Sequence, residues 1–204
     1  MKPSLTDFLQ GELSRPSRIL LLLVALALIP GLFLPVWQIT LHAPQYPGGL
    51  TVDIYANTVG GDLQEVNGLN HYIGMAEIHP DEFPEFKFIP FFILRFLAFA
   101  GLAFLVARIP IAAIGYIDFA LFGVVMLADF QGWLTRYGQN LDPAAAIEIE
   151  PFTPKFLGTT EVGQFAVTSF PTIATGLMAL AGLAGPAILL YEWRRRRAGA
   201  SGDA

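Results

Sequence analysis

The chain has 204 residues, of which 54% are hydrophobic and only 14% are charged, whereas about 25% of the residues of a typical soluble domain are charged. It contains no cysteine, which excludes a disulfide scaffold, a cysteine zinc site, an iron–sulfur cluster and thiol catalysis. Its net charge of −5 gives no support to nucleic-acid binding, because no basic surface is available to contact phosphates. The composition therefore favours an integral membrane protein.

Four apolar runs are long enough to cross the hydrocarbon core of a bilayer, which is about 30 Å thick. These predicted spans are residues 19–38, 88–107, 109–128 and 165–192. The remaining segments are a terminus (1–18), a first long loop (39–87), a second long loop (129–164) and a tail (193–204). We predict an all-α membrane protein, a four-transmembrane-helix bundle with two long non-cytoplasmic loops.

The first run could instead be a cleaved signal peptide, because Arg15 and Arg18 precede it. The small-residue site that follows is Leu41-His42-Ala43, with Leu41 at −3 and Pro44 at +1, and both features are poor for cleavage. A retained membrane anchor is the favoured interpretation.

The distribution of lysine and arginine predicts the orientation. Basic residues lie in the N-terminal segment, at Arg108 between the second and third spans, and in the run 194–197, whereas residues 39–86 contain neither lysine nor arginine. We therefore expect a multi-pass protein of a bacterial inner membrane, with both termini in the cytoplasm and both long loops in the periplasm. The arginine run is expected to anchor at lipid headgroups.

The first loop contains signals for a hairpin and a short helix. Ile39 and Leu41, and then Leu50, Val52 and Ile54, alternate with polar neighbours around a Pro/Gly turn, which predicts a small β-hairpin. Further along, Asn70 is a plausible N-cap for a helix that begins near His71 and is stopped by Pro80.

All three histidines lie in this loop, at His42, His71 and His79. In a helix, His71, Met75 and His79 would share one face at i, i+4 and i+8. Imidazole and thioether groups together suit copper, so copper is the cofactor that this pattern suggests. His42 could complete the site only if the hairpin folds over the helix. The competing interpretation is ordinary packing, because Gly74 weakens the helix and one methionine is a thin copper signature.

Two opposite charges lie inside predicted spans. Arg95 and Asp118 fall at similar depth in two antiparallel spans joined by a tight turn, so a mutual intramembrane ion pair is favoured over a proton or ion path. In the fourth span, Ala181 and Gly185 have the small-xxx-small spacing of closely packed helices. That spacing could serve this bundle or a larger complex.

The second loop begins with an aromatic stripe. Phe130, Trp133 and Tyr137 recur at three- and four-residue steps, a pattern suited to the membrane interface. The proline-spaced chain that follows Glu150 is expected to be extended.

Three loop segments, 41–47, 69–75 and 137–143, resemble a family of small four-span bacterial membrane proteins. Members of that family are encoded beside the clade II (Sec-exported) nitrous oxide reductase, a copper enzyme. The resemblance implies an accessory role: helping to mature, anchor or supply electrons to a periplasmic copper enzyme. The family has no established catalytic residues to carry over.

Three functions remain open. The first is a membrane accessory protein for a periplasmic copper-dependent reductase, and the second is a non-catalytic subunit of a larger respiratory membrane complex. The third is a small transporter or channel, suggested only by Arg95 and Asp118. We do not expect an enzyme, because no nucleophile–base pair or phosphate-binding glycine loop is visible. The expected partners are the lipid bilayer and that enzyme or other membrane subunits, without nucleic acid.

Overall fold

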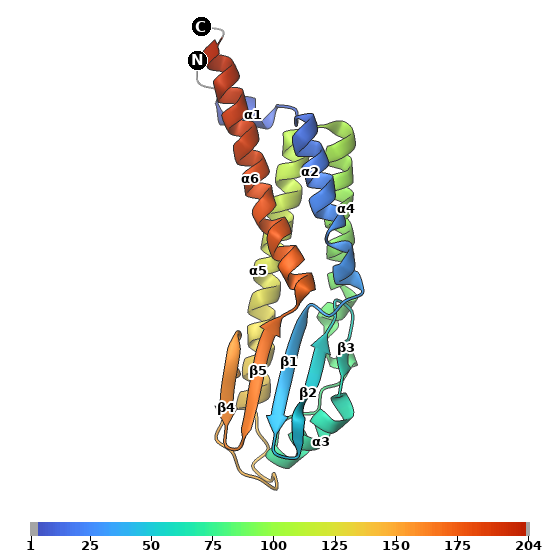
Figure 1. Ribbon diagram of the computed structural model, residues 1–204, viewed down its shortest axis with the longest axis vertical. Helices are drawn as coiled ribbons and strands as arrows, with labels where there is room; N and C mark the ends of the chain where they lie inside the picture. The colour runs from blue at the N-terminus through green and yellow to red at the C-terminus, as the bar shows by residue number, and fades with distance from the viewer. Residues whose placement is uncertain (1–3, 203–204) are drawn as a thin grey trace. The chain divides into compact units, whose positions relative to one another are not determined.

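The computed structural model describes residues 4–202, which divide into two compact units. A helical unit comprises residues 1–30, 90–123 and 176–204, and a sheet unit comprises residues 31–89 and 124–175. The bounds of the elements of each unit are given below and can be followed in Figure 1.

Four helices are long and apolar enough to cross a membrane: Arg15–Leu32, Pro84–Val106, Ile109–Gln139 and Ile173–Gly199. The chain thus fits a multi-pass membrane protein. The elements that form these spans, together with the short helix that precedes them, are α1 (Leu5–Leu9), α2 (Arg15–Leu26), the 3-10 turn η1 (Ile29–Leu32), α4 (Ile89–Val106), α5 (Ile109–Gln139) and α6 (Ile173–Gly202).

The helical unit is packed through small and aromatic residues. Phe96 of α4 is 1% exposed and contacts the rings of Tyr116 and Phe119 of α5. Gly185 of α6 lies against the Tyr116 ring so closely that a Cβ there would come within 2.1 Å of it. Ala181, one turn earlier, is 1% exposed. The small-residue spacing of the fourth span therefore serves packing within this bundle.

Residues of the arginine run bind the N-terminal segment. The buried carboxylate of Glu192 accepts hydrogen bonds from the backbone N–H and the hydroxyl of Ser14, which is the N-cap of α2, and it pairs with Arg195 at 3.1 Å. Arg196 donates to the carbonyl of Glu12 at 2.7 Å. The predicted tail is not separate from the fourth helix, because α6 continues to Gly202.

The sheet unit is built from both long connections. Its elements are β1 (Trp37–Ala43), β2 (Tyr46–Ile54), β3 (Val59–Gly61), α3 (Leu63–Ile73), the 3-10 turns η2 (Pro80–Glu82) and η3 (Pro84–Lys87), β4 (Gly158–Val162) and β5 (Phe165–Pro171). The strands form one antiparallel sheet in the order β3-β2-β1-β5-β4. The predicted hairpin is confirmed as β1 and β2, with Ile39 opposite Val52 and Leu41 opposite Leu50.

The predicted all-α fold is wrong, because the chain has a five-stranded antiparallel sheet. Residues 165–171, assigned above to the fourth span, form β5, and the helix begins only at Ile173. The apolar run conceals a two-residue alternation: Phe165 and Ser169 are buried, while Phe170 between them and the helix is 51% exposed. Hydropathy does not reveal this alternation, because the polar residue Ser169 is the buried one and the apolar residue Phe170 is the exposed one.

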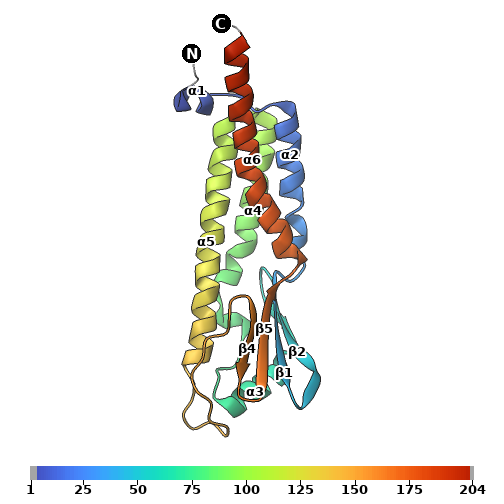
Figure 2. The same cartoon turned by 60° about the vertical axis from the view of Figure 1, so that its left-hand side comes forward.

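One face of the sheet is covered and the other is open. Leu50 and Val52 pack with Val66 of α3 and with Phe83 and Phe86 in one core cluster, while Trp133 and Tyr137 of α5 lie against it. Figures 1 and 2 show α3 and the C-terminal part of α5 on one side of the sheet, with no described element over the other.

The aromatic stripe of α5 belongs to this covered side. Phe130 packs on Trp37 and Phe156 with ring centroids 5.1 and 5.5 Å away, and Trp133 packs on Phe83 at 4.5 Å. These rings therefore fill the core of the sheet unit, where the sequence pattern had suggested the membrane interface.

A buried serine joins the two halves of the sheet. The fully buried hydroxyl of Ser169 on β5 accepts from the indole N–H of Trp37 on β1 at 2.8 Å and donates to the carbonyl of Phe156 at 3.1 Å. Its removal would leave the buried indole N–H of Trp37 and the carbonyl of half-buried Phe156 without their partner.

We predict that Ser169→Ala lowers the free energy of unfolding by about 1–3 kcal/mol, the cost of unpaired buried polar groups. The measurement is thermal and denaturant unfolding of the detergent-solubilised protein, followed by tryptophan fluorescence. Thr168→Ala, on the same strand but on the open face, is the control and should cost less than Ser169→Ala, because the partner of its hydroxyl, Thr159, is exposed to solvent. Equal losses in the two variants would contradict this role for Ser169.

Candidate functional site

The residues predicted to bind copper do not share a helix face. α3 ends at Ile73, and Gly74 caps it in the left-handed conformation at φ 77°. The predicted helix from Asn70 onward is therefore wrong: His71 belongs to the last turn of α3, whereas Met75 and His79 lie beyond its end.

The amide side chains of Asn67 and Asn70 explain why the helix stops. Asn67 accepts from the N–H of Ile78 at 2.8 Å and donates to its carbonyl at 3.1 Å. Asn70 donates from its side chain to the carbonyl of Ala76 at 3.1 Å. Both asparagines thus bond to the chain that leaves α3, so Asn70 stabilises a helix end where the sequence had suggested a helix start.

A close approach at Gly74 fixes the same turn. Its carbonyl accepts from the N–H of Asp142 in the second connection at 2.8 Å, and a Cβ at Gly74 would come within 2.7 Å of the Asp142 carbonyl oxygen. No side chain fits there, so glycine is required by space as well as by φ.

The remaining histidines are also separated. His79 contacts the Glu77 carboxylate at 3.0 Å, and both side chains are more than half exposed. His42 is exposed on β1 between the buried residues Leu41 and Ala43, which face the α3 side. His42 therefore lies on the opposite face of the sheet from His71.

The donor set thus does not fit a preformed copper site. Among the described residues, no group of three or more His, Cys, Asp or Glu side chains is placed to hold a metal ion. Met75, the one thioether of the pattern, is half-buried against the cluster formed by Leu41, Ala43, Ile73 and Phe165. Its packing matches the competing interpretation made from the sequence.

The charged residues inside the predicted spans are in contact. Arg95 donates from Nε to Asp118 Oδ2 at 2.9 Å and from Nη2 to Oδ1 at 2.5 Å. The guanidinium also lies over the Phe92 ring, 4.2 Å from its centroid. The result is a bidentate ion pair with an aromatic cover.

The open face of the sheet carries a row of threonines that the sequence analysis missed. Thr51, Thr40, Thr168 and Thr159 lie opposite one another on β2, β1, β5 and β4. Neighbouring strands are about 4.8 Å apart, so the row extends about 14 Å across the sheet. The hydroxyls of Thr159 and Thr168 are 3.1 Å apart. The row is formed by segments far apart in the chain, so no local pattern could reveal it.

Charged and polar side chains flank the threonine row. Gln38 donates to the Asp53 carboxylate at 2.8 Å on one side, and His42 lies on the other. We define the open face by the residues that share this side of the sheet: Gln38, Thr40, His42, Thr51, Asp53, Thr159, Glu161, Ala166, Thr168 and Phe170. Its charged side chains are the two carboxylates, with no lysine or arginine.

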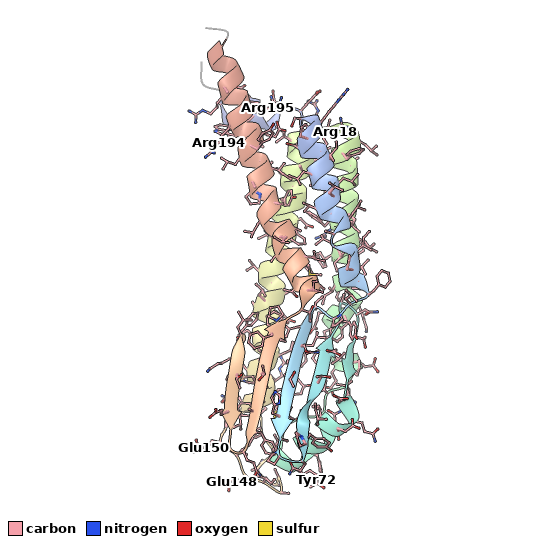
Figure 3. All side chains as sticks on the ribbon, in the orientation of Figure 1. Arg18, Tyr72, Glu148, Glu150, Arg194 and Arg195 are labelled. Atoms are coloured by element: carbon pink, nitrogen blue, oxygen red, sulfur yellow. The ribbon has the colours of Figure 1, made fainter. Side chains whose placement is uncertain are left out.

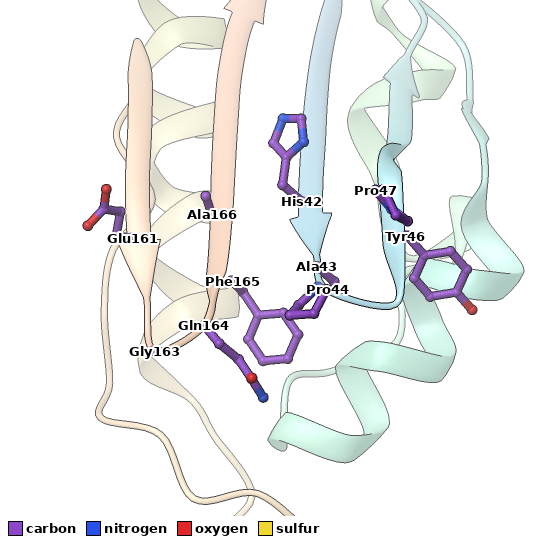
Figure 4. A pocket seen from close by; sticks show the side chains of 10 residues that line it. All are labelled: His42, Ala43, Pro44, Tyr46, Pro47, Glu161, Gly163, Gln164, Phe165 and Ala166. Carbon is purple, nitrogen blue, oxygen red and sulfur yellow. The ribbon is translucent and has the colours of Figure 1, made fainter.

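A shallow pocket of about 300 Å³ lies where the β1–β2 and β4–β5 turns meet. Its lining includes His42, Pro44, Gln164 and Phe165. Figure 4 shows the Glu161 carboxylate directed away from His42, over the outer edge of β4. The pocket is therefore a recess at the end of the sheet that does not bring an acid and a base together.

We predict that copper content does not depend on the histidines and methionine of the first connection. The purified protein and a His71→Ala/Met75→Ala/His79→Ala variant should retain equal copper after desalting, because these side chains do not converge. Inductively coupled plasma mass spectrometry measures it. A stoichiometric copper in the wild type that the variant loses would contradict the prediction.

Searches against known protein families and against curated proteins find no match to this chain. These comparisons do not link the chain to accessory proteins of nitrous oxide reductase, so that resemblance stays a prediction from the three loop segments 41–47, 69–75 and 137–143.

Proposed function

We propose that the chain is a non-catalytic accessory protein of the bacterial cytoplasmic membrane. It uses the open face to dock a periplasmic respiratory enzyme. The observation that carries this proposal is the open face itself, a mainly polar surface on a sheet whose other side is covered. The role of the spans is then to hold this surface at the membrane.

The chemistry of the sheet unit favours a partner with a basic surface. Residues 31–89 and 124–175 carry twelve acidic and three basic side chains, a net charge of −9. Opposite charges on two proteins speed their encounter and select the partner more than they raise affinity. Threonine hydroxyls and methyls, with Phe170 exposed beside Gln38, supply both hydrogen bonds and apolar contact.

A copper-dependent nitrous oxide reductase is the first partner to test. The family resemblance of the three loop segments is the reason for this choice. Since His71, Met75 and His79 do not converge on one site, we favour anchoring or assembly of the enzyme over metal transfer by this chain. The alternative is a docking subunit within another respiratory membrane complex, which would use the same open face.

The orientation is part of the proposal. Basic residues at the ends of the helical unit support a cytoplasmic location for the termini. Figure 3 shows Arg18, Arg194 and Arg195 together toward one end of that unit. The acidic connections that form the sheet unit are then periplasmic.

Because the chain has no cysteine, single cysteines can report this topology. We predict that a membrane-impermeant maleimide labels Gln64→Cys, on the exposed side of α3, in intact spheroplasts. Gln10→Cys, an equally exposed glutamine position next to α1, should be labelled only after lysis. The reverse pattern would contradict the orientation.

Docking is tested by placing a positive charge on the open face. We predict that Gln38→Arg reduces recovery of nitrous oxide reductase with the affinity-tagged chain at least several-fold, because it neutralises the neighbouring Asp53 carboxylate and adds a longer side chain to the open face. The measurement is immunoblotting after co-purification from a host that expresses both proteins. Gln64→Arg makes the same substitution on α3 and should leave recovery unchanged.

Two results would contradict the docking proposal in different ways. Equal recovery with Gln38→Arg and with the wild type would exclude the open face as the contact surface. Failure of the wild-type chain to recover the reductase at all would exclude that enzyme as the partner.

A further inference from the structure

The Arg95–Asp118 ion pair lies deep within the predicted membrane spans. At 1.5 Å per residue, Arg95 is about 9 Å from Ile89 and about 16 Å from Val106 along α4. Asp118 is about 14 Å along α5 from Ile109. Both charges are thus placed where lipid offers only hydrocarbon.

The helices of the unit do not enclose this pair. The side chain of Arg95 is 32% exposed and that of Asp118 is 28% exposed. The enclosed side of the same two helices is formed by Phe96 and Tyr116, which are 1% and 6% exposed. The ion pair therefore lies on the outer side of the α4–α5 contact.

Arg95 also keeps unused hydrogen-bond donors. Arginine has five N–H groups, and the two bonds to Asp118 use Nε and one hydrogen of Nη2. Within residues 4–202, Nη1 of Arg95 makes no hydrogen bond. Hydrocarbon cannot accept these bonds, and charged groups in membranes characteristically face protein or water.

We propose that this outer side of α4 and α5 is the interface between two copies of the chain in the membrane. The surface carries a positive and a negative group side by side, so it is complementary to itself under a two-fold rotation about the membrane normal. That rotation places Arg95 near Asp118 of the second copy and gives the unused donors carboxylate acceptors. In a two-fold interface the same patch serves both subunits.

Apolar residues surround the charges on this outer side, so a second copy would meet no further charge there. On α5, Ile114 and Leu121 lie one turn before and after Asp118 and are 55% and 61% exposed. On α4, Ala98 follows Arg95 by three residues and is exposed, so its small side chain allows a second helix to approach closely. The pairing goes beyond the proposed docking function, since it uses residues of the helical unit and the docking proposal uses residues of the sheet unit.

Cysteine crosslinking in native membranes tests the interface without altering the charges. We expect Ala98→Cys in one copy and Ile114→Cys in a co-expressed second copy, which lie on the same side of the ion pair along the membrane normal, to form a disulfide-linked species of twice 22.2 kDa on mild oxidation. Ala187→Cys is the matched control, since Ala187 is also an exposed alanine in a membrane helix, on α6. A yield at these positions no greater than at Ala187 would overturn the proposal, and so would an adduct with a different protein.

A charge exchange separates pairing between copies from pairing within one copy. In the doubly exchanged variant (Arg95→Asp with Asp118→Arg), each copy keeps a complementary internal pair. Two such copies also remain complementary to each other, but a wild-type copy would then face like charges. We expect differently tagged copies to co-purify as wild type with wild type and variant with variant, with at least several-fold lower recovery of the mixed pair. Equal recovery of all three combinations would overturn the proposal, whatever the outcome of the docking experiment.

Discussion

The sheet unit depends on the antiparallel pairing of β1 with β5. β1 follows the first span and β5 precedes the last, so a single ladder from Trp37–Pro171 to His42–Ala166 joins connections more than a hundred residues apart. Without it, the first connection retains three strands and the second only a hairpin, which is marginally stable by itself. The Trp37–Ser169–Phe156 hydrogen bonds lie at this seam and meet at the fully buried hydroxyl of Ser169. The seam is therefore where the two connections become one folded unit.

The same pairing creates the open face. Strands alternate their side chains, so once Trp37 and Ser169 face the covered core, Thr40 and Thr168 must face the other side. The row of four threonines exists only because β2, β1, β5 and β4 stand in that order. The accessory function proposed here thus follows from a fold-level constraint, since no segment carries the surface alone.

The helical unit satisfies its polar groups in two contrasting ways. Glu192 is enclosed and bound by Ser14 and Arg195, so its charge is used inside the unit. Arg95 and Asp118 are bound to each other but remain about one-third exposed. Hydrogen-bond donors of Arg95 are therefore left without an acceptor within the described part of the helical unit. The two ion pairs have similar chemistry, but only the exposed pair leaves donors for a second copy, which is why the proposed interface lies at α4 and α5.

The sequence by itself determined four apolar helices, the β1–β2 hairpin and the acidic character of the two long connections. The length of an apolar run, a two-residue alternation and the local excess of one charge are all properties of short segments. The sequence also named Arg95 and Asp118 as partners, since a short connection sets their depth. Only the tertiary structure decided the rest. The long-range β1–β5 ladder turned residues 165–171 into a strand, and the contacts of Asn67, Asn70 and Gly74 ended α3 before Met75 and His79 could join His71. Non-local hydrogen bonds overrode local pattern at both places, because a buried backbone or amide group must find a partner wherever the fold provides one.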